Sequence, residues 1–274
     1  PATFLIAVFS FWPMIKALVL SFQTGKGRNM QMAGFTNYIR MFQDDVFIQS
    51  IKNTFFYFIL QVPIMLVVAM VLACILNKKD LRFKGFFRTM IFVPCTTSLV
   101  AYSIIFRSLF ANNGLVNYVL VNIGILDKPY NFLTQPFAAK MVILLGLLWR
   151  WTGYNMVFFL SGLQNIEYSV YEAAKIDGAS AIQTFFKITV PLLKPTILLT
   201  AIMSTNGTLQ LFDESVNLTD GGPANASISM SHYIYNLCFK YVPNFGYAAA
   251  MSFFILLLVA VLAFIQMRVG DKRD

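Results

Sequence analysis

Residues 171 to 195, YEAAKIDGASAIQTFFKITVPLLKP, form the stretch that decides how this chain folds. The segment is polar and lies between two strongly apolar ones. Its Asp177-Gly178 pair is a turn signal, because glycine readily adopts the left-handed backbone conformation that ends a helix. We therefore expect a short helix over 172–176, a bend, and a second short helix over 179–187. A helical hairpin of this kind can occur in any protein that crosses a membrane several times.

The composition predicts that lipid surrounds most of the chain. Apolar residues make up 58% of the 274 residues, charged residues only 12%, and the mean hydropathy is +0.66. A soluble domain carries about a quarter charged residues, whereas about 20 apolar residues span a bilayer as a helix. The six candidate spans are 1–22, 53–76, 87–110, 140–163, 188–212 and 246–267. Because these runs lack the alternation of a β-barrel, we predict an all-α transmembrane bundle of six helices, a single domain over 1–274.

The loops between these runs predict how the chain lies in the membrane. Cytoplasmic loops carry an excess of Lys and Arg. With both termini cytoplasmic, eleven such residues lie in inner loops and seven in outer ones, and the densest group is at 78–88. The 171–195 segment then faces the cytoplasm, and the net charge of +9 reflects topology and anionic lipid rather than nucleic-acid binding. Since the chain opens at Pro1 inside an apolar run, we expect the first span to begin upstream.

Two external segments are expected to contain short helices. One covers 44–52, ahead of the second span. The other lies within 224–245, where Tyr233, Tyr235 and Tyr241 would sit at the level of the lipid headgroups.

The sequence offers little material for catalysis or metal binding. The three cysteines have neither a disulfide nor a metal-site spacing, and His232 is the only histidine. The chain has no P-loop, so ATP hydrolysis would have to come from another polypeptide. A membrane enzyme or an ion-coupled secondary transporter remains the alternative reading. Either would need acidic or histidine side chains within the spans, and only Asp213 and Glu214 come close.

The 171–195 segment resembles the EAA loop of permeases from ATP-binding-cassette (ABC) importers. The resemblance rests on Glu172-Ala-Ala174, on Asp177-Gly178 five residues on, and on Ile188-Thr-Val-Pro191. In that family the loop is the cytoplasmic element that docks into a groove of the ATPase subunit. The resemblance implies that ATP and magnesium are bound by that partner and that this chain has no cofactor of its own. The implied ATPase-coupling residues are Glu172, Ala173, Ala174, Asp177 and Gly178.

The resemblance extends over nearly the whole chain and is specific to carbohydrate importers. The segment Gly34-Phe-Thr-Asn-Tyr38 and the segment Leu218-Thr-Asp-Gly-Gly-Pro223 look like those of the first permease subunit in importers of the maltose, glycerol-phosphate and multiple-sugar type. The chain lacks the extra N-terminal spans and the large periplasmic insertion of the sugar-holding maltose subunit. The implied partners are a homologous second permease, a cytoplasmic ABC ATPase dimer, an extracytoplasmic sugar-binding protein, a sugar and membrane lipids. The implied location is the bacterial plasma membrane.

The same resemblance implies a sugar site halfway across the membrane. The Trp-x-Gly-Tyr element of the family matches Trp151-Thr-Gly-Tyr154, and the proline of an earlier helix matches Pro94. Carried over by motif, the sugar-facing positions are Cys95, Leu99, Trp149, Thr152, Gly153, Met156, Ser204 and Thr208. Cys95, Leu99 and Met156 replace more polar or aromatic residues of the family, so the position of the site carries over more readily than the identity of the sugar.

The positions of these residues within the predicted spans place them at one depth in the membrane. Ser204 and Thr208 share one helix face, Asn206 and Gln210 share another, and polar side chains within a bilayer are expected to face a cavity or a partner helix. The competing interpretation is that Ser, Thr and Gly simply mediate helix packing.

Arg150 lies near the centre of the fourth predicted span, 140–163. A guanidinium facing lipid at mid-bilayer costs about 2.5–3.5 kcal/mol on insertion scales. No acidic residue of this chain is expected at its depth. We therefore expect Arg150 to line the pathway, binding the sugar or pairing with the second permease, and an arginine bonded to backbone carbonyls between helices is the alternative.

Overall fold

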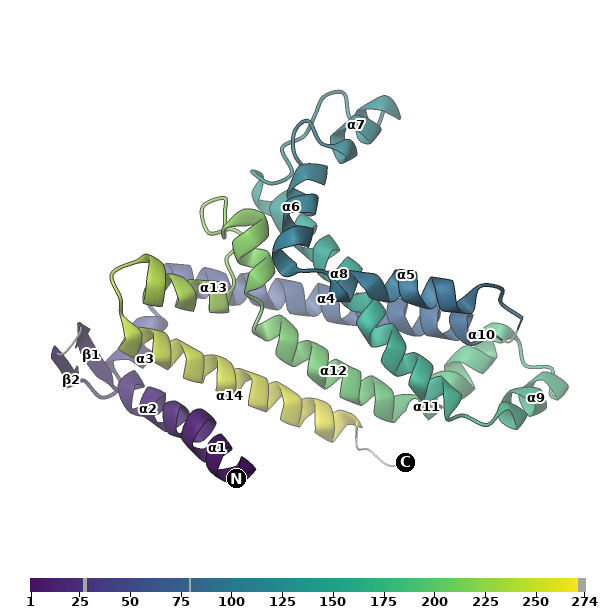
Figure 1. Cartoon of the computed structure of the whole chain (residues 1–274), viewed down its shortest axis with the longest axis horizontal. Helices are drawn as coiled ribbons and strands as arrows, with labels where there is room; N and C mark the ends of the chain where they lie inside the picture. Colours follow the sequence, from purple (N-terminus) through teal and green to yellow (C-terminus); the bar gives the residue numbers. More distant parts are fainter. Residues whose placement is uncertain (27–28, 79, 271–274) are drawn as a thin grey trace.

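The computed structural model describes residues 1–26, 29–78 and 80–270. As the sequence predicts, the fold is built from helices (Figure 1). Along the chain these are α1 (Ala2–Ile6), α2 (Trp12–Ser21), α3 (Thr36–Met41), α4 (Asp45–Asn77), α5 (Lys84–Thr96), α6 (Leu99–Leu109), α7 (Leu115–Asn122), α8 (Pro136–Gln164), α9 (Tyr168–Ile176), α10 (Ala181–Thr184), α11 (Val190–Leu192), α12 (Lys194–Leu209), α13 (Met230–Tyr235) and α14 (Phe245–Gly270). Wider π-helical turns occupy Ala7–Phe11, Phe185–Thr189, Ser215–Thr219 and Asn236–Lys240. An antiparallel hairpin of β1 (Gln23–Lys26) and β2 (Asn29–Met32), which the sequence analysis did not anticipate, follows α2.

Among the residues that the structure describes, four helical stretches are long and apolar enough to cross a membrane. They are Ala2–Ser21, α4, α8 and α14. The two other expected spans are not straight helices, and this corrects the prediction for 87–110 and 188–212. The first consists of α5 and α6, bent by 98°, and the second of Ala181–Leu192 and α12, bent by 71°. The count reaches six when each bent pair is taken as one span.

The bend between α5 and α6 follows from Pro94. Proline has no backbone N–H and crowds the preceding turn, so a helix rarely continues straight past it. α5 ends two residues later, Thr97 and Ser98 take extended conformations, and the Thr97 hydroxyl donates to the Pro94 carbonyl at 2.7 Å. In the second bent pair, Leu193 breaks the helix and Pro195 lies in the first turn of α12, a position that tolerates proline.

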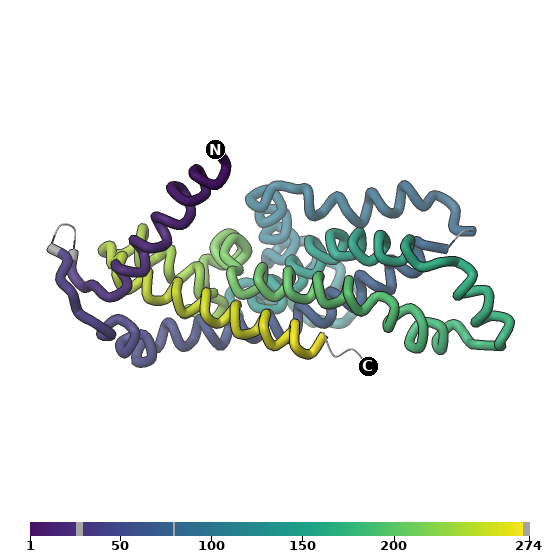
Figure 2. The backbone as a smooth tube through the Cα atoms, turned by 90° about the horizontal axis from the view of Figure 1, so that it is seen from below, coloured from purple at the N-terminus to yellow at the C-terminus, as the bar shows by residue number. Residues whose placement is uncertain are grey.

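The centre of the bundle is the contact between α4 and α8, which run alongside each other together with α5 (Figure 1). Near one end of the pair, the small residues Ala69 and Ala73 of α4 pack against Phe159 and Leu163 of α8. Further along, Tyr57 of α4 packs in a cluster with residues of α6 and α8. The N-terminal helices leave this bundle: Figure 2 shows them projecting away from it, in contact with α14 through α2.

Asp44 ties the start of α4 to two other segments. One carboxylate oxygen accepts hydrogen bonds from the backbone N–H groups of Val46 and Phe47, which caps the helix. The other accepts from the hydroxyls of Tyr233 in α13 at 2.7 Å and Tyr247 in α14 at 2.8 Å. The prediction of a separate short helix over 44–52 is therefore wrong, since this stretch forms the first turns of α4 and nothing interrupts the helix after its cap.

The predicted helical hairpin is present at one end of the molecule. α9 begins at Tyr168, earlier than expected, and Gly178 ends it with a φ of +74°. The second helix begins at Ala181 because the Ser180 hydroxyl and the Gln183 side chain form a reciprocal capping box. Both views place this hairpin at the same end as the start of α5 and its basic segment (Figures 1 and 2).

Candidate functional site

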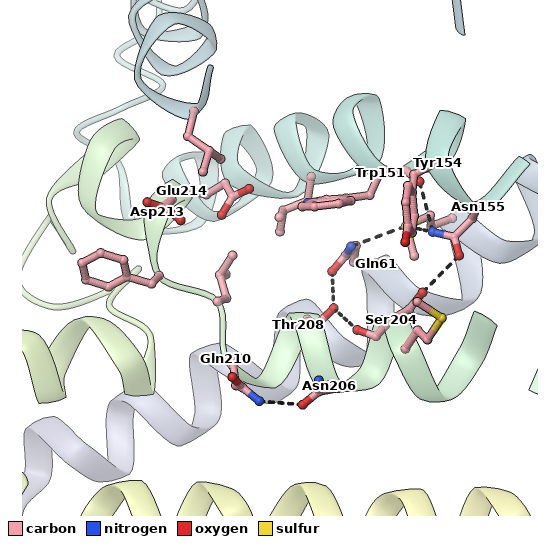
Figure 3. A pocket seen from close by; sticks show the side chains of 17 residues that line it. Gln61, Trp151, Tyr154, Asn155, Ser204, Asn206, Thr208, Gln210, Asp213 and Glu214 are labelled. Atoms are coloured by element: carbon pink, nitrogen blue, oxygen red, sulfur yellow. Dashed lines mark hydrogen bonds between the residues drawn. The ribbon is translucent and has the colours of Figure 1, made fainter. Parts of the chain in front are cut away.

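A cavity of about 390 Å³ lies where four helices meet (Figure 3). Its walls come from α4, α6, α8 and α12 and from the segment that follows α12. The residues that line it are Gln61, Met65, Leu99, Leu147, Trp151, Tyr154, Asn155, Met203, Ser204, Asn206, Gly207, Thr208, Gln210, Leu211, Phe212, Asp213 and Glu214. Its volume is in the range of small-molecule sites, and aromatic rings and polar groups share its surface.

Hydrogen bonds join three of the helices around this cavity. The Thr208 hydroxyl of α12 lies 2.7 Å from the amide oxygen of Gln61 in α4 and 2.8 Å from the Ser204 carbonyl. The Ser204 hydroxyl donates to the amide oxygen of Asn155 in α8 at 3.3 Å, and the Asn155 amide donates to the Trp151 carbonyl at 3.1 Å. Figure 3 shows these contacts as one connected path. The polar groups are therefore held in place before any ligand arrives.

Sequence reasoning missed Gln61 and Asn155. Each is a single amide inside an apolar run, and such a residue is costly in lipid unless it faces a cavity or a partner. That signal was available in the sequence. The hydrogen bond between Gln61 and Thr208 could not be predicted from the sequence, because the two residues are far apart in the chain.

One helix face of α8 lines the cavity. It carries Leu147, Trp151, Tyr154 and Asn155, spaced as i, i+4, i+7 and i+8, so they fall on one side of a helix with 3.6 residues per turn. The Trp151 and Tyr154 rings meet edge to face, with centroids 5.8 Å apart. Flat aromatic faces beside amide groups suit a ligand with both apolar C–H and hydroxyl surfaces.

The structure divides the predicted site residues, those carried over by motif together with Arg150, into two groups. Leu99, Ser204 and Thr208 line the cavity. The others do not: Cys95, Trp149, Arg150, Thr152, Gly153 and Met156 lie elsewhere. The reason is geometric for α8, because a shift of one or two residues rotates a side chain by about 100° or 200° around the helix. A contact of these residues with a sugar stays a prediction.

Packing accounts for several residues of the second group. The Met156 side chain is fully buried in a cluster with Phe159. Trp149 packs against the ring of Phe106 at 5.5 Å and that of Tyr102 at 6.2 Å. Gly153 lies against α5, where a Cβ would overlap the Ile91 carbonyl oxygen.

Arg150 adopts the alternative arrangement, in which the arginine bonds to a backbone carbonyl oxygen between helices. Its guanidinium is 6% exposed and donates to the Thr97 carbonyl at 2.8 Å, at the bend between α5 and α6. The faces of Tyr102 and Trp151 each lie 5.4 Å from its central carbon, a cation–π distance. The expectation that no acidic residue lies at the depth of Arg150 stays a prediction, and the charge of Arg150 acts on the buried Glu214 carboxylate. Glu214 reaches this position because the chain after α12 folds back toward α8.

The segment after Glu214 forms a buried polar network around His232. The imidazole is fully buried, its Nδ1 lies 2.9 Å from the Ser215 hydroxyl, and Nε2 lies 3.6 Å from an Asp220 carboxylate oxygen. Burial disfavours the imidazolium and lowers the pKa of His232 to about 4. Within the described ranges, no group of three or more His, Cys, Asp or Glu side chains could hold a metal ion.

The residues of the hairpin that resembles an EAA loop are mostly exposed. Glu172, Ala173, Asp177 and Gly178 face outward, whereas Ala174 is buried. Three large apolar side chains project from the same hairpin: Ile176 is 85%, Ile182 72% and Phe186 65% exposed. Exposed apolar groups beside polar ones are typical of a surface that binds another protein.

Comparison with known proteins shows a family match over most of the chain. The model of the family described as "Binding-protein-dependent transport system inner membrane component" matches residues 32–273. The chain is similar to the lactose transport system permease protein of Rhizobium radiobacter, with 52% identity over 100% of this chain and 92% of the relative. It is also similar to the arabinooligosaccharides transport system permease protein of Bacillus subtilis (strain 168), with 31% identity over 97% of this chain and 84% of the relative.

Two solved structures have the same fold. One is a bacterial ABC transporter involved in the import of the acidic polysaccharide alginate, with a TM-score of 0.86 and 24% identity over 98% of this chain and 92% of that chain. The other is a bacterial alginate ABC transporter in complex with an alginate pentasaccharide-bound periplasmic protein, with a TM-score of 0.86 and 25% identity over 99% and 92%. The resemblance to an ABC importer permease and the predicted fold class are thereby confirmed.

Proposed function

This chain belongs to the family of binding-protein-dependent transport system inner membrane components, and on that premise we propose that its cavity holds a saccharide as it crosses the membrane. The chain is a non-catalytic permease subunit of a sugar importer, as its relatives are. The membrane-enzyme and ion-coupled alternatives are therefore set aside. Because the lactose permease is 52% identical over the whole chain, lactose is the first saccharide to test.

The observation that carries the proposal is the hydrogen-bonded wall of the cavity. Gln61, Asn155, Ser204 and Thr208 come from three helices and converge on one space. Most saccharides present hydroxyls in several directions, and preorganised donors and acceptors bind them at a low entropic cost. Trp151 adds a flat surface for the apolar face of a sugar ring.

The partners form a further part of the proposal. Membership of a binding-protein-dependent family means that a substrate-binding protein works with this chain. We infer in addition a homologous second permease and an ABC ATPase dimer, with the α9–α10 hairpin as the coupling element. The exposed Ile176, Ile182 and Phe186 support this role for the hairpin. The basic segment at the same end favours a cytoplasmic position, with both termini inside.

Removal of single hydroxyls from the cavity tests its role. We expect Ser204→Ala or Thr208→Ala to lower ATP-driven lactose uptake by a few-fold to about tenfold, because each lost hydrogen bond contributes about 0.5–1.5 kcal/mol. The measurement is uptake by the complete importer in proteoliposomes. Thr200→Ala is the matched control, since the Thr200 hydroxyl is bonded to the backbone of its own helix. Uptake by the cavity variants at the rate of the Thr200 control would show that Ser204 and Thr208 only pack helices.

A second prediction concerns coupling through Gly178. A Cβ at this position meets no atom within 4 Å, so only the backbone φ of +74° opposes substitution. Valine resists this conformation, and we expect Gly178→Val to reach the membrane but to hydrolyse ATP without uptake. Gly178→Asn should retain uptake, because asparagine tolerates the left-handed region. Gly34→Val is the matched control at another loop, where φ is +57° and space is equally open. Normal uptake by Gly178→Val would remove the basis for this role.

A further inference from the structure

We propose that the cavity selects uncharged saccharides over acidic ones and that Asp213 and Glu214 are the residues that determine this specificity. The inference rests on the proposed function of the cavity. It concerns the charge of the substrate, which the fold alone does not decide, since a transporter with the same fold imports an acidic polysaccharide.

The charge of the cavity wall is negative. Asp213 and Glu214 both line it, on the side that Figure 3 shows beyond Trp151. Among the described residues that line this cavity, none is Lys, Arg or His. Burial raises the pKa of Glu214 and favours its uncharged form, so the negative charge of the wall is carried chiefly by Asp213.

Arg150 offsets only part of this charge. Its positive charge favours the ionised form of Glu214, but its side chain does not line the cavity. Its guanidinium donates to the Thr97 carbonyl and lies over the faces of the Tyr102 and Trp151 rings. Arg150 is thus placed to balance the buried Glu214 rather than to bind an anion inside the cavity. Asp213 is half-buried and contributes its charge to the cavity surface.

The same carboxylates suit a neutral saccharide. An ionised carboxylate accepts charge-assisted hydrogen bonds from hydroxyls, and these are about twice as strong as bonds between neutral groups. Gln61, Asn155 and Asn206 provide amides that both donate and accept. A uronate would instead place a like charge beside Asp213 in a partly enclosed space. Repulsion between like charges is one way in which specific sites exclude wrong ligands.

The experiment compares two sugars that differ in one carboxylate. The probes are lactose and the same disaccharide with its galactose C6 oxidised to galacturonate. Binding to the purified complete transporter is measured by calorimetry without the binding protein, so that the selectivity of that protein does not enter. We expect the uronate to bind the unmodified transporter at least about tenfold more weakly than lactose, because of like-charge repulsion.

Asp213→Asn should narrow the difference between the two sugars to about threefold or less by strengthening uronate binding, since it removes one charge and keeps the side-chain shape. Glu214→Gln is the second variant and should narrow the difference less than Asp213→Asn, because burial already favours the uncharged form of Glu214. Asp127→Asn is the matched control, because it makes the same charge change at an exposed position outside the cavity. The thermal unfolding midpoint of each variant checks that the complex remains folded.

The outcomes separate the two proposals. Equal binding of lactose and the uronate by the unmodified transporter would overturn the selectivity and leave the saccharide site intact. The selectivity is also overturned if Asp127→Asn narrows the difference as much as Asp213→Asn does. If neither sugar binds the unmodified transporter, the proposed saccharide site itself fails, and the selectivity fails with it.

Discussion

Gly153→Ala is expected to separate α5 from α8 and to leave little assembled importer in the membrane. A Cβ at this position would overlap the Ile91 carbonyl oxygen and lie 3.1 Å from the Phe92 Cα. Both neighbours are backbone atoms of α5, so no flexible side chain can move aside. Overpacking of a close helix contact costs about 1–3 kcal/mol and sometimes more. We expect a fall of several degrees in the thermal unfolding midpoint of the purified complex and a matching loss of uptake.

Gly85→Ala provides the control for this prediction. Gly85 is also in α5, but a Cβ there meets nothing within 4 Å, so the substitution should be neutral or stabilising by about 0.5–1 kcal/mol. A Gly153→Ala variant with unchanged stability and weakened lactose binding would contradict the packing role and support the sugar contact inferred from the family motif.

Arg150→Leu is expected to destabilise the complex and to abolish uptake. The change removes the donor to the Thr97 carbonyl at the bend between α5 and α6, and it removes a positive charge that favours the ionised form of Glu214. A buried polar group left without its hydrogen-bond partner costs about 1–3 kcal/mol, and here that group is the Thr97 carbonyl at the bend. The measurements are the unfolding midpoint and the uptake rate in proteoliposomes.

A second substitution distinguishes this role from that of a sugar ligand. If Arg150 acts by balancing Glu214, combining Arg150→Leu with Glu214→Gln should restore part of the lost stability, since no uncompensated charge remains. A sugar ligand would give no such rescue. An Arg150→Leu variant that is as stable and active as the unmodified importer would show that the buried contacts of Arg150 matter to neither property.

Local patterns in the sequence predicted much of the fold. The Asp177-Gly178 turn, the capping residue Ser180 and the long apolar runs of α4, α8 and α14 all depend on neighbours within a few residues. The bend after Pro94 was missed for a different reason. Proline signals that a helix is weakened, but whether it bends by 98° depends on contacts such as that of Arg150 with Thr97, 53 residues away.

Only some of the residues that line the cavity were predicted from the sequence. Ser204 and Thr208 were placed correctly on one face of α12, because a spacing of four residues fixes a helix face. On α8 the motif led to Trp149 and Met156, whereas Trp151 and Asn155 line the cavity. The rotation of a helix about its axis is set by packing against its neighbours, and an apolar run has similar side chains on every face.

The contacts of Asp44 have a consequence for how the importer can change shape. One carboxylate joins the N-terminus of α4 to α13 and α14, so a movement that separated these three segments would leave a charge without partners. We therefore expect these three segments to move together. The bends of 98° after Pro94 and 71° at Leu193 are then the positions at which we expect relative motion. Alternating access in this subunit would accordingly be a rotation of α5 and α12 about their bends, relative to the start of α4, α13 and α14.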